Sequence, residues 1–465
     1  MTKDWQPRGP RPKNTPLHEW ISKAIADDIA AGHLRPGDAL PAQRDLADVL
    51  GVALGTVTRG YASARQRGLV VGQRRRGTVV ALDPGVDARM ASIVGGPPSE
   101  IDLAANLPIY AADPDPSEAL REIARRPDVR QLLRYPPPEG LPRHRGAAAQ
   151  WLQAQGVPVV ARDIVLSGGA QHGILLALAA VARPGDAVFV EALTYPGVLA
   201  AARMLGLNVV PVAIDEQGLD PDALAEAFAR HPARALYCIP TLHNPTTVSL
   251  SEDRKHRIAT IVDRHQSIII EDEIHRALVP HPRVRTFYEM LPERTVLISA
   301  ASKSIAGGLR VGFVAAPAAL RPPLLSAVQA SAFAVGPLGA ELFATWLEDG
   351  TLSRTLTQKR KEAARRIRLV HDELDAVPGV HVRTADHGYL AWVTLPQGRS
   401  ASSLAAQAQQ RGVRVAAKAA FCATPFGDDD AVRLSVGTAE RKDSLVSALR
   451  TLKAILTEAP APTVY

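Results

Sequence analysis

The chain has 465 residues, more than one compact core normally contains, so two or more domains are expected. Apolar residues make up 46% of the chain and charged residues 22%, a balance that excludes a disordered or fibrous protein. Two cysteines exclude a disulfide framework and a four-thiolate zinc site. The first ten residues lack the apolar core of a signal peptide, and the longest apolar run is half a membrane span. We therefore expect a soluble cytoplasmic protein without a metal site or a membrane contact.

The net charge of +7 is concentrated in one part of the chain. Residues 1–82 contain 13 Lys or Arg and 7 Asp or Glu, a net charge of +6, whereas the other 383 residues contain 41 basic and 40 acidic side chains. A small basic module attached to a near-neutral one predicts a nucleic-acid contact at the N-terminus. A merely solvated basic surface would give the same charge.

Three short amphipathic helices are predicted within residues 15–82, after a polar tail over residues 1–14. Apolar residues recur at helical spacing over 17–29, 46–50 and 57–64. Pro41 is expected in the first turn of the second helix, and Val49 on its buried face.

The third helix is expected to have an exposed polar side, formed by Thr56, Thr58, Arg59 and Ser63. A helix-turn-helix presents side chains to a DNA major groove in this way. A β-hairpin is predicted over residues 68–80, and its tip, residues 74–76, would direct three guanidinium groups toward phosphates.

The glycines, prolines and arginines of this segment follow a distinctive order. The chain has GHLRPGDALPAQRDLA over residues 32–47, then Gly51-Val52, Thr56-Val57 and Arg76-Gly77-Thr78. With these motifs the segment resembles the winged helix-turn-helix of the GntR transcriptional regulators. The resemblance implies a set of DNA-binding residues, namely Arg44 on the backbone, Thr56, Thr58 and Arg59 in the groove, and Arg75, Arg76 and Gly77 along the minor groove. Leu54 stands where many relatives have arginine, so base specificity cannot be carried over.

A second, larger domain is predicted after a linker over residues 83–100, which contains Pro-Gly and Gly-Gly-Pro-Pro breakers. From residue 101 onward, short β-rich runs alternate with Ala-rich helical stretches. Strands are expected over 164–166, 187–190, 209–214, 235–239, 267–270, 296–299 and 312–315. Such alternation predicts an α/β domain with a mostly parallel sheet, covered on both faces, and with its binding residues at the carboxyl ends of the strands.

Two of these strand ends carry groups suited to binding. The first strand runs into Gly168-Gly169 and an apolar helix, whose N-terminus can bind phosphate, although two glycines are more often a plain tight turn. The strand over 267–270 ends in Glu271-Asp272-Glu273. These carboxylates would line the cleft unless they are solvated or cap the next helix.

Lys303 follows the strand over 296–299 in a chain that has ten lysines and 44 arginines. A lysine retained there suggests a chemistry that guanidinium cannot supply, the formation of a Schiff base by a neutral amine. A surface lysine is the more common alternative. Six residues are expected after strands or near strand ends: Tyr195, Asn244, Asp272, Lys303, Arg310 and Arg433. Together they supply the ring, amide, carboxylate, amine and guanidinium groups that pyridoxal 5'-phosphate and an amino acid need.

With these residues the segment 101–456 is similar to the fold-type I aminotransferases, and the whole chain resembles the MocR subfamily of GntR regulators. The resemblance implies pyridoxal 5'-phosphate as cofactor and a smaller C-terminal α/β subdomain over about 345–456, before a tail over 457–465. It also implies a homodimer, arranged head-to-tail, which matches paired half-sites on double-stranded DNA.

The resemblance assigns a role to each site residue. Lys303 would hold the cofactor as a Schiff base, Asp272 would bind the pyridine nitrogen, and Asn244 the phenolic oxygen. The other cofactor-binding residues would be Tyr195 stacked on the ring, Ser302, and a phosphate site of Gly169, Ala170, Gln171 and Arg310, with Tyr135 reaching across from a second subunit. Arg433 would clamp the carboxylate of an amino acid bidentately.

Two residues depart from the family pattern. His275 stands where relatives usually place a tyrosine hydroxyl on the phenolic oxygen, and Ala300 where a phosphate-binding serine is usual. His275 is expected to donate a hydrogen bond and to change its charge near neutral pH. These changes fit two alternatives. The domain binds the cofactor but with altered chemistry, or it is a degenerate domain without cofactor.

The leading hypothesis is a transcriptional regulator that binds operator DNA and senses an amino acid, an amine or pyridoxal 5'-phosphate itself. One alternative is a functional class I/II aminotransferase that carries an accessory DNA-binding module. Another is a DNA-binding dimer that uses the large domain only as a scaffold.

Overall fold

The structure is a computed structural model that describes residues 5–8, 16–30, 33–34, 37–66, 69–73, 77–80, 90, 100–424, 429–439 and 441–458. The chain divides into two compact units, one of Met1–Ser92 with Thr424–Asp428 and one of Ile93–Ala423 with Asp429–Tyr465. Most of the predicted linker, the tip of the predicted hairpin and most of both predicted tails lie outside the described residues.

The N-terminal unit contains three helices and a hairpin, as predicted. They are α1 (Leu17–Ala30), α2 (Gln43–Leu50), α3 (Leu54–Gln66), β1 (Val70–Gln73) and β2 (Gly77–Val80). Ile21 and Ile25 of α1 are buried against Val57 and Tyr61 of α3 in one apolar core. Helix α2 ends at Gly51, whose left-handed φ of +64° lets its N–H bond back to the last turn.

Some details of this unit differ from the sequence prediction. Val49 is 65% exposed, and Pro41 precedes the N-cap residue of α2 instead of occupying its first turn. The Ser63 hydroxyl donates to Ser22 Oγ of α1 at 3.2 Å, so Ser63 faces α1 and not the polar side of α3. Helical periodicity alone could not distinguish these faces, because each helix is only two to four turns long.

Part of the predicted polar tail belongs to the core of the N-terminal unit. Trp5 is buried with the core residues of α1 to α3, and its indole N–H donates to Asp28 Oδ2 at 2.7 Å. The prediction of a wholly polar tail was therefore wrong. A single tryptophan among polar residues gives no periodic signal, yet its large ring buries enough apolar area to anchor the segment in the core.

The larger unit contains two sheets and their covering helices. Its helices are α5 (Ser117–Arg125), α6 (Pro142–Gln153), α7 (Ala170–Val181), α8 (Pro196–Met204), α9 (Pro221–Arg230), α10 (Glu252–Arg264), α11 (Phe287–Met290), α12 (Arg321–Ala332), α13 (Pro337–Glu348), α14 (Thr351–Leu374), α15 (Ala401–Gln410) and α16 (Lys442–Thr457). Its strands are β3 (Ile101–Asp102), β4 (Ile164–Ser167), β5 (Ala187–Glu191), β6 (Asn208–Val212), β7 (Ile214–Asp215), β8 (Gly218–Leu219), β9 (Ala235–Cys238), β10 (Ile268–Asp272), β11 (Thr295–Ala300), β12 (Gly312–Ala315), β13 (His381–Thr384), β14 (Leu390–Thr394), β15 (Val413–Arg414), β16 (Ala416–Ala417) and β17 (Ala431–Ser435).

The larger sheet has seven strands in the order β4-β12-β11-β10-β9-β5-β6. Strand β12 runs antiparallel to both of its neighbours, and the remaining pairs are parallel. The predicted mostly parallel sheet is therefore confirmed, with each expected strand present. The run predicted over 209–214 divides into β6 and the short hairpin strand β7.

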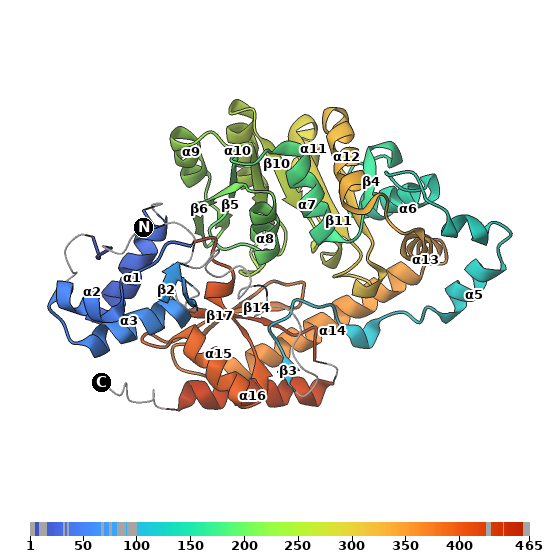
Figure 1. Ribbon diagram of the computed structural model, residues 1–465. Helices are drawn as coiled ribbons and strands as arrows, with labels where there is room; N and C mark the ends of the chain where they lie inside the picture. Colours follow the sequence, from blue (N-terminus) through green and yellow to red (C-terminus); the bar gives the residue numbers. More distant parts are fainter. Residues whose placement is uncertain are drawn as a thin grey trace. The chain divides into compact units, whose positions relative to one another are not determined.

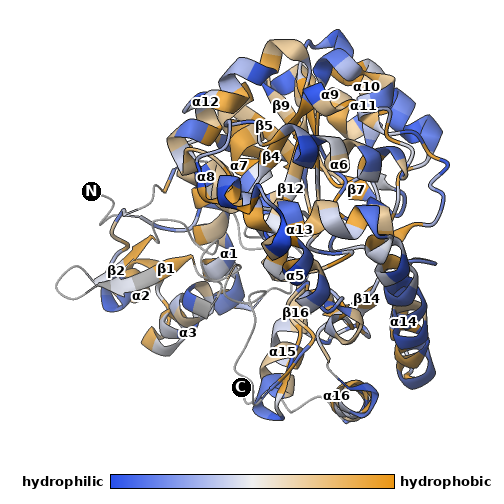
Figure 2. Cartoon of the chain, turned by 90° about the vertical axis from the view of Figure 1, so that its right-hand side faces the viewer, coloured by the Kyte–Doolittle hydropathy of each residue, from blue (hydrophilic) through white to orange (hydrophobic). Residues whose placement is uncertain are grey.

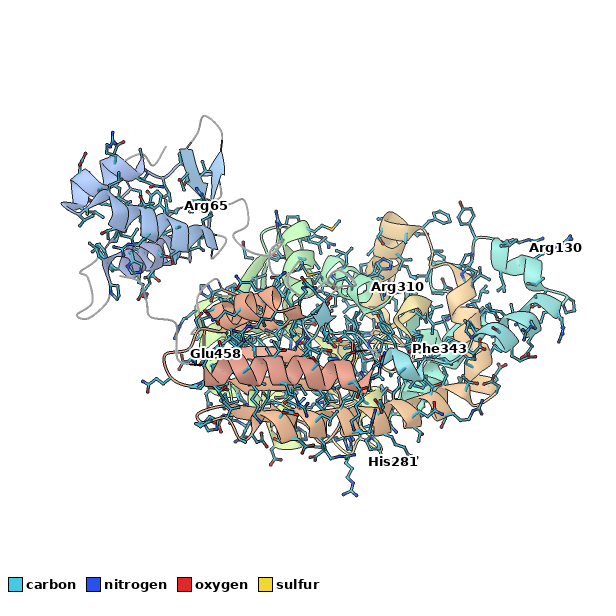
Figure 3. All side chains as sticks on the ribbon, turned by 90° about the horizontal axis from the view of Figure 1, so that it is seen from below. Arg65, Arg130, His281, Arg310, Phe343 and Glu458 are labelled. Carbon is cyan, nitrogen blue, oxygen red and sulfur yellow. The ribbon has the colours of Figure 1, made fainter. Side chains whose placement is uncertain are left out.

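Helices cover both faces of this sheet (Figure 1). Helix α7 packs on β10, β11 and β12 at Gly173, where a Cβ atom would lie 3.1 Å from Ile298 Cγ2. On the opposite face, Phe313 of β12 meets Phe343 of α13 with ring centroids 5.2 Å apart. Figure 3 shows Phe343 among densely packed side chains, whereas Arg130 projects at the edge of the unit.

The smaller sheet is antiparallel, in the order β13-β14-β17-β16, and packs against α14 and α15. Strand β3 pairs with β15, so the first described residues of the larger unit join its C-terminal part. Helix α14 has a largely hydrophilic outer surface, while the strands of the larger sheet are mostly hydrophobic (Figure 2). Among the described helices, no single one is long and apolar enough to cross a membrane, although the bent pair Ala318–Ala332 and Pro337–Glu348 together meet these criteria.

Candidate functional site

A cavity of about 250 Å³ lies at the carboxyl ends of β9, β10 and β11. Its walls come from the larger sheet, the N-terminus of α7 and the segment that follows β3. The residues around it are Asn106, Leu107, Pro108, Tyr110, Ala170, Gln171, Tyr195, Ile239, Asn244, Asp272, Ile274, His275, Ser302, Lys303, Gly307, Gly308 and Arg310. The structure thus brings together most of the predicted site residues.

Lys303 follows β11 and lines this cavity. Its ammonium group donates a hydrogen bond to the backbone oxygen of Asn106. Burial, together with the positive charges of Arg433 and Arg310, lowers the pKa of Lys303 to about 8. The negative charge of Asp272 has the opposite effect and raises it. Near pH 8 this lysine is therefore an amine for much of the time, the form that attacks a carbonyl carbon.

Asp272 is the last residue of β10 and is buried against the cavity. Burial raises its pKa to about 6, opposed by hydrogen bonds from the Tyr237 hydroxyl at 2.7 Å and the Ile274 N–H at 3.2 Å. The carboxylate is therefore ionised at neutral pH. Tyr237 was missed in the sequence, although a tyrosine in an otherwise apolar strand needs a polar partner and could have indicated one.

Glu271 and Glu273 do not reach the cavity, which corrects the prediction of a carboxylate cluster at the cleft. Successive side chains of a strand point to opposite faces, so Asp272 and Glu271 diverge. The Nζ atom of Lys255 lies 3.5 Å from an oxygen of each glutamate, and Arg276 lies 3.6 Å from Glu273. Glu271 also accepts hydrogen bonds from two N–H groups at the start of α11. Glu271 thus caps α11, the alternative left open in the sequence analysis, and both glutamates are paired with buried cationic side chains.

The end of the cavity near α7 is suited to an anion. Gly169 has φ of +91°, and a Cβ atom on it would lie 2.8 Å from Arg310 Nη2. Only glycine admits both this backbone and the close guanidinium. Arg310 donates to the Gly168 oxygen at 2.7 Å, beside Ala170 at the first turn of α7. Ala300 ends β11 and is buried, without a side-chain hydroxyl to add.

Tyr195 lies at the start of α8 and depends on a glycine that was missed in the sequence. A Cβ atom on Gly197 would lie 2.2 Å from the Tyr195 ring and 2.1 Å from Gln171 Oε1. Gln171 also donates to the Gly197 oxygen at 2.8 Å. The absence of a side chain at residue 197 therefore allows the ring and the amide to lie against each other in the cavity wall.

Arg433 lies in the middle of β17, not at a strand end as predicted, and it is not one of the residues lining the cavity. Its guanidinium is fully buried over the Phe421 ring, with 5.1 Å from Cζ to the centroid. It donates to Asn244 Oδ1 at 3.2 Å and to the Ala104 backbone oxygen. Burial lowers its pKa to about 10, so it remains charged at neutral pH.

His275 behaves differently from the sequence expectation. Its pKa is lowered to about 3 by burial and by the positive charges of Lys303 and Arg433. The ring therefore stays neutral near pH 7, and the predicted change of charge there was wrong. Its Nε2 atom lies 3.3 Å from the side-chain nitrogen of Asn106, a residue that no sequence motif indicated.

The remaining predicted residues are separated from the cavity or lie in the N-terminal unit. Tyr135 is 85% exposed and stacks edge-on against Phe333, with ring centroids 5.0 Å apart. Among the predicted DNA-binding residues, Arg44, Thr58 and Arg59 are exposed, Thr56 is half-buried and Gly77 begins β2 with φ of +77°. Arg75 and Arg76 lie outside the described residues.

Comparisons with known proteins agree with this division of the chain. The sequence matches the family described as aminotransferase class I and II over residues 98–449, and the gntR family of bacterial regulatory proteins over residues 17–80. It is similar to the HTH-type transcriptional regulator YdeF of Bacillus subtilis, with 28% identity covering 95% of this chain and 94% of YdeF. The HTH-type pyridoxine biosynthesis transcriptional regulator PdxR of Corynebacterium glutamicum is 28% identical, covering 87% of this chain and 88% of PdxR.

Among solved structures, the α-aminoadipate aminotransferase LysN of Thermus thermophilus, complexed with N-(5'-phosphopyridoxyl)-L-leucine, has a TM-score of 0.70 and 25% identity over 79% of this chain and 96% of LysN.

The close approach at Gly197 predicts a cost for any side chain there. Gly197→Ala should lower the free energy of unfolding by about 1–3 kcal/mol, because the methyl group must displace Tyr195 or Gln171. Urea denaturation of the full chain measures this change. Gly146→Ala on α6, where a Cβ atom meets nothing within 4 Å, is the matched control. Equal stability of the two variants would contradict the packing described.

The lowered pKa of Lys303 predicts its reactivity. Acetylation of Lys303 by a pulse of acetic anhydride should increase with pH around a midpoint near pH 8, because only the neutral amine reacts. Mass spectrometry of the labelled peptide gives the rate at each pH. A midpoint above pH 10, the range of an ordinary lysine at about pKa 10.4, would show that the amine is not buried among positive charges.

Proposed function

We propose that this chain, a member of the aminotransferase class I and II family that also carries a gntR-family domain, is a DNA-binding transcriptional regulator. This combination of domains is the MocR architecture. In our proposal the regulator senses small molecules through pyridoxal 5'-phosphate. One observation carries the proposal. Lys303, Asp272 and Asn244 converge on a single cavity in a chain whose N-terminal unit is a helix-turn-helix. The similarity to the regulators YdeF and PdxR over most of their length supports it.

The groups around the cavity fit pyridoxal 5'-phosphate. The N-terminus of α7, with Gly169 and Arg310, suits a phosphate, and the Asp272 carboxylate suits a protonated ring nitrogen. The buried oxygens Asn106 Oδ1 and Gln171 Oε1 have no hydrogen-bond partner within the described part of the chain. Such acceptors are costly to bury unless a bound group satisfies them.

When bound, pyridoxal 5'-phosphate supplies a carbonyl group that captures primary amines and a ring that withdraws electrons. Lys303 would provide the amine that holds this carbonyl group, and the pKa of about 8 means that part of this lysine is neutral near pH 7 to 8. Asp272, ionised at neutral pH and oriented by the Tyr237 hydroxyl, would bind the ring nitrogen. Tyr195 and Asn244, which line the same cavity, would contact the ring and its phenolic oxygen.

The effector that we propose is an amino acid, an amine or the cofactor itself, bound in the same cavity. Arg433 would bind the carboxylate of an amino acid. Its present acceptors, Asn244 Oδ1 and the Ala104 backbone oxygen, would then be exchanged for carboxylate oxygens. An amine without a carboxylate would leave both hydrogen bonds intact, so the two ligand classes would act differently on the segment around Ala104.

A homodimer in the cytoplasm completes the proposal. Exposed apolar side chains gather in two neighbouring segments of the larger unit, and these are Leu133, Tyr135, Phe333 and Leu338. A contact with a second copy would bury them. Tyr135 does not reach the phosphate end of its own cavity, since it is not one of the lining residues, so any role there requires a partner subunit.

A functional aminotransferase is the second candidate. The retained Lys303 and Asp272 and the similarity to LysN favour it. Sustained conversion of an amino acid and a keto acid by the purified chain, at rates of about 1 per second or more, would favour the enzyme over the regulator.

Removal of the amine tests the cofactor site. Wild-type protein incubated with pyridoxal 5'-phosphate should acquire a visible absorption band that survives gel filtration, and Lys303→Ala should lack this band because no other amine lines the cavity among the described residues. Lys359→Ala, which removes a buried lysine paired with Asp113 elsewhere in the unit, is the control. The same band in wild type and Lys303→Ala would refute the assignment.

Removal of a guanidinium tests the DNA-binding surface. Arg44→Ala should weaken binding to a duplex selected from a random pool, and should reduce the slope of log affinity against log salt by about 1, as expected for one lost phosphate contact. Lys23→Ala makes the same change of charge on α1, where Lys23 already pairs with Asp27 at 2.8 Å. Fluorescence anisotropy at several salt concentrations measures both variants. Equal slopes for Arg44→Ala and wild type would contradict the surface proposed.

A further inference from the structure

Asn106 contacts both Lys303 and His275 in the cavity. Its backbone oxygen accepts a hydrogen bond from the Lys303 amine, and its side-chain nitrogen lies 3.3 Å from His275 Nε2. One residue thus touches both the reactive amine and the imidazole that replaces the usual tyrosine. Asn106 lies four residues after β3, in a segment of which Asn106, Leu107, Pro108 and Tyr110 line the cavity.

The segment that carries Asn106 is held firmly at both sides. The Leu103 N–H donates to the Arg414 oxygen at 2.8 Å, and the Ser435 N–H donates to the Leu103 oxygen at 2.8 Å. Two consecutive N–H groups, those of Ala104 and Ala105, donate to Asp102 Oδ1. Further along, a Cβ atom at Gly437 would lie 2.2 Å from the Leu107 oxygen, so a glycine admits the chain there. The amide of Asn106 is therefore presented from a fixed backbone.

The imidazole of His275 is buried, and its Nε2 atom already has a partner. Its side chain is only 2% exposed, and its Nε2 atom is engaged with the Asn106 amide. Because the ring is neutral, it carries one N–H and one lone pair, and it can orient an amide without bringing a charge beside Lys303. Asn106 and His275 both line the cavity, and the Asn106 amide is the group that the imidazole holds there.

The oxygen of that amide is unsatisfied. Asn106 Oδ1 is buried and accepts no hydrogen bond from the described residues. Gln171 Oε1 is also unsatisfied, but it lies against Tyr195, as the clash distances at residue 197 show, and so belongs to the ring-stacking wall. The unsatisfied oxygen on Asn106 therefore belongs to the same residue whose backbone oxygen accepts a hydrogen bond from the Lys303 amine. An acceptor in that place suits a ligand with N–H donors and not a keto compound, which has none.

Resting on the function proposed above, we infer that Asn106 binds the amino group of the effector through its side-chain oxygen, and that His275 is a positioning residue that holds this amide in place. The ligand class is a primary amine, with or without a carboxylate. The Asn106 backbone oxygen is at the same time available to the Lys303 amine, so one residue accepts hydrogen bonds from both nitrogens.

The test uses the full-length protein loaded with pyridoxal 5'-phosphate and titrated with methylamine, whose only polar group is the amino group. The change in visible absorption gives the half-saturating concentration. Asn106→Ala and Asn106→Leu should raise it roughly three- to tenfold, the effect of one lost hydrogen bond of about 0.7–1.4 kcal/mol. The dissociation constant of the cofactor, measured by equilibrium dialysis without methylamine, should change less than twofold.

His275→Ala provides the second half of the test. It should raise the half-saturating concentration by a similar factor, and the double variant His275→Ala with Asn106→Ala should be no worse than either single variant, because both remove the same contact. Asn208→Ala is the control, since the Asn208 amide is exposed and donates to the Gly185 oxygen outside the cavity. It should leave the titration unchanged.

The outcomes separate the inference from the function on which it rests. If wild type responds to methylamine and both Asn106 variants respond equally well, the inference is wrong and the proposed function stands. If the Asn106 variants lose cofactor affinity as much as they lose methylamine affinity, Asn106 is a structural residue and the inference is again wrong. If wild type acquires no absorption band, both fail.

Discussion

The burial of Lys303 among positively charged groups is the condition on which the chemistry of this cavity depends. An amine in water is protonated at neutral pH and cannot attack a carbonyl carbon. Here burial and the charge of Arg433 lower its pKa to about 8, and the opposing effect of Asp272 is smaller. Asp272 in turn stays ionised because the Tyr237 hydroxyl and a backbone N–H partly offset its burial. The sheet makes this arrangement possible, since the parallel strands β9, β10 and β11 end at the same edge.

The sequence predicted those site residues that lie at or immediately after the end of a strand. Runs of apolar residues located β10 and β11, and the lysine and aspartate that follow them are the groups found in the cavity. The same reasoning failed for Glu271 and Glu273, because it located the strand end but not the alternation of faces along the strand. It also failed for Arg433, whose hydrogen-bond acceptors lie in the segment that follows β9 and in the segment that follows β3.

The residues that were missed have no local signal. Asn106 is one polar residue in a loop, and it matters only because the fold brings Lys303 and His275 to it from positions 197 and 169 residues further along the chain. Gly197 follows a proline in the first turn of α8, and only the packing of Tyr195 and Gln171 shows why it lacks a side chain. The charge of His275 depends likewise on burial, which composition cannot indicate. Contacts between distant segments are thus the part that required a structure.

The basic N-terminal unit and the cofactor cavity have separate physical requirements, and a regulator must couple them. The most direct test is the affinity of the full-length protein for a duplex selected from a random pool, measured with and without pyridoxal 5'-phosphate and with methylamine added. A regulatory function predicts that the cofactor or the amine changes the affinity of the wild-type protein for DNA. The Lys303→Ala variant should still bind DNA but should lose this change. An affinity that is the same under all conditions, or a response that Lys303→Ala retains in full, would contradict it.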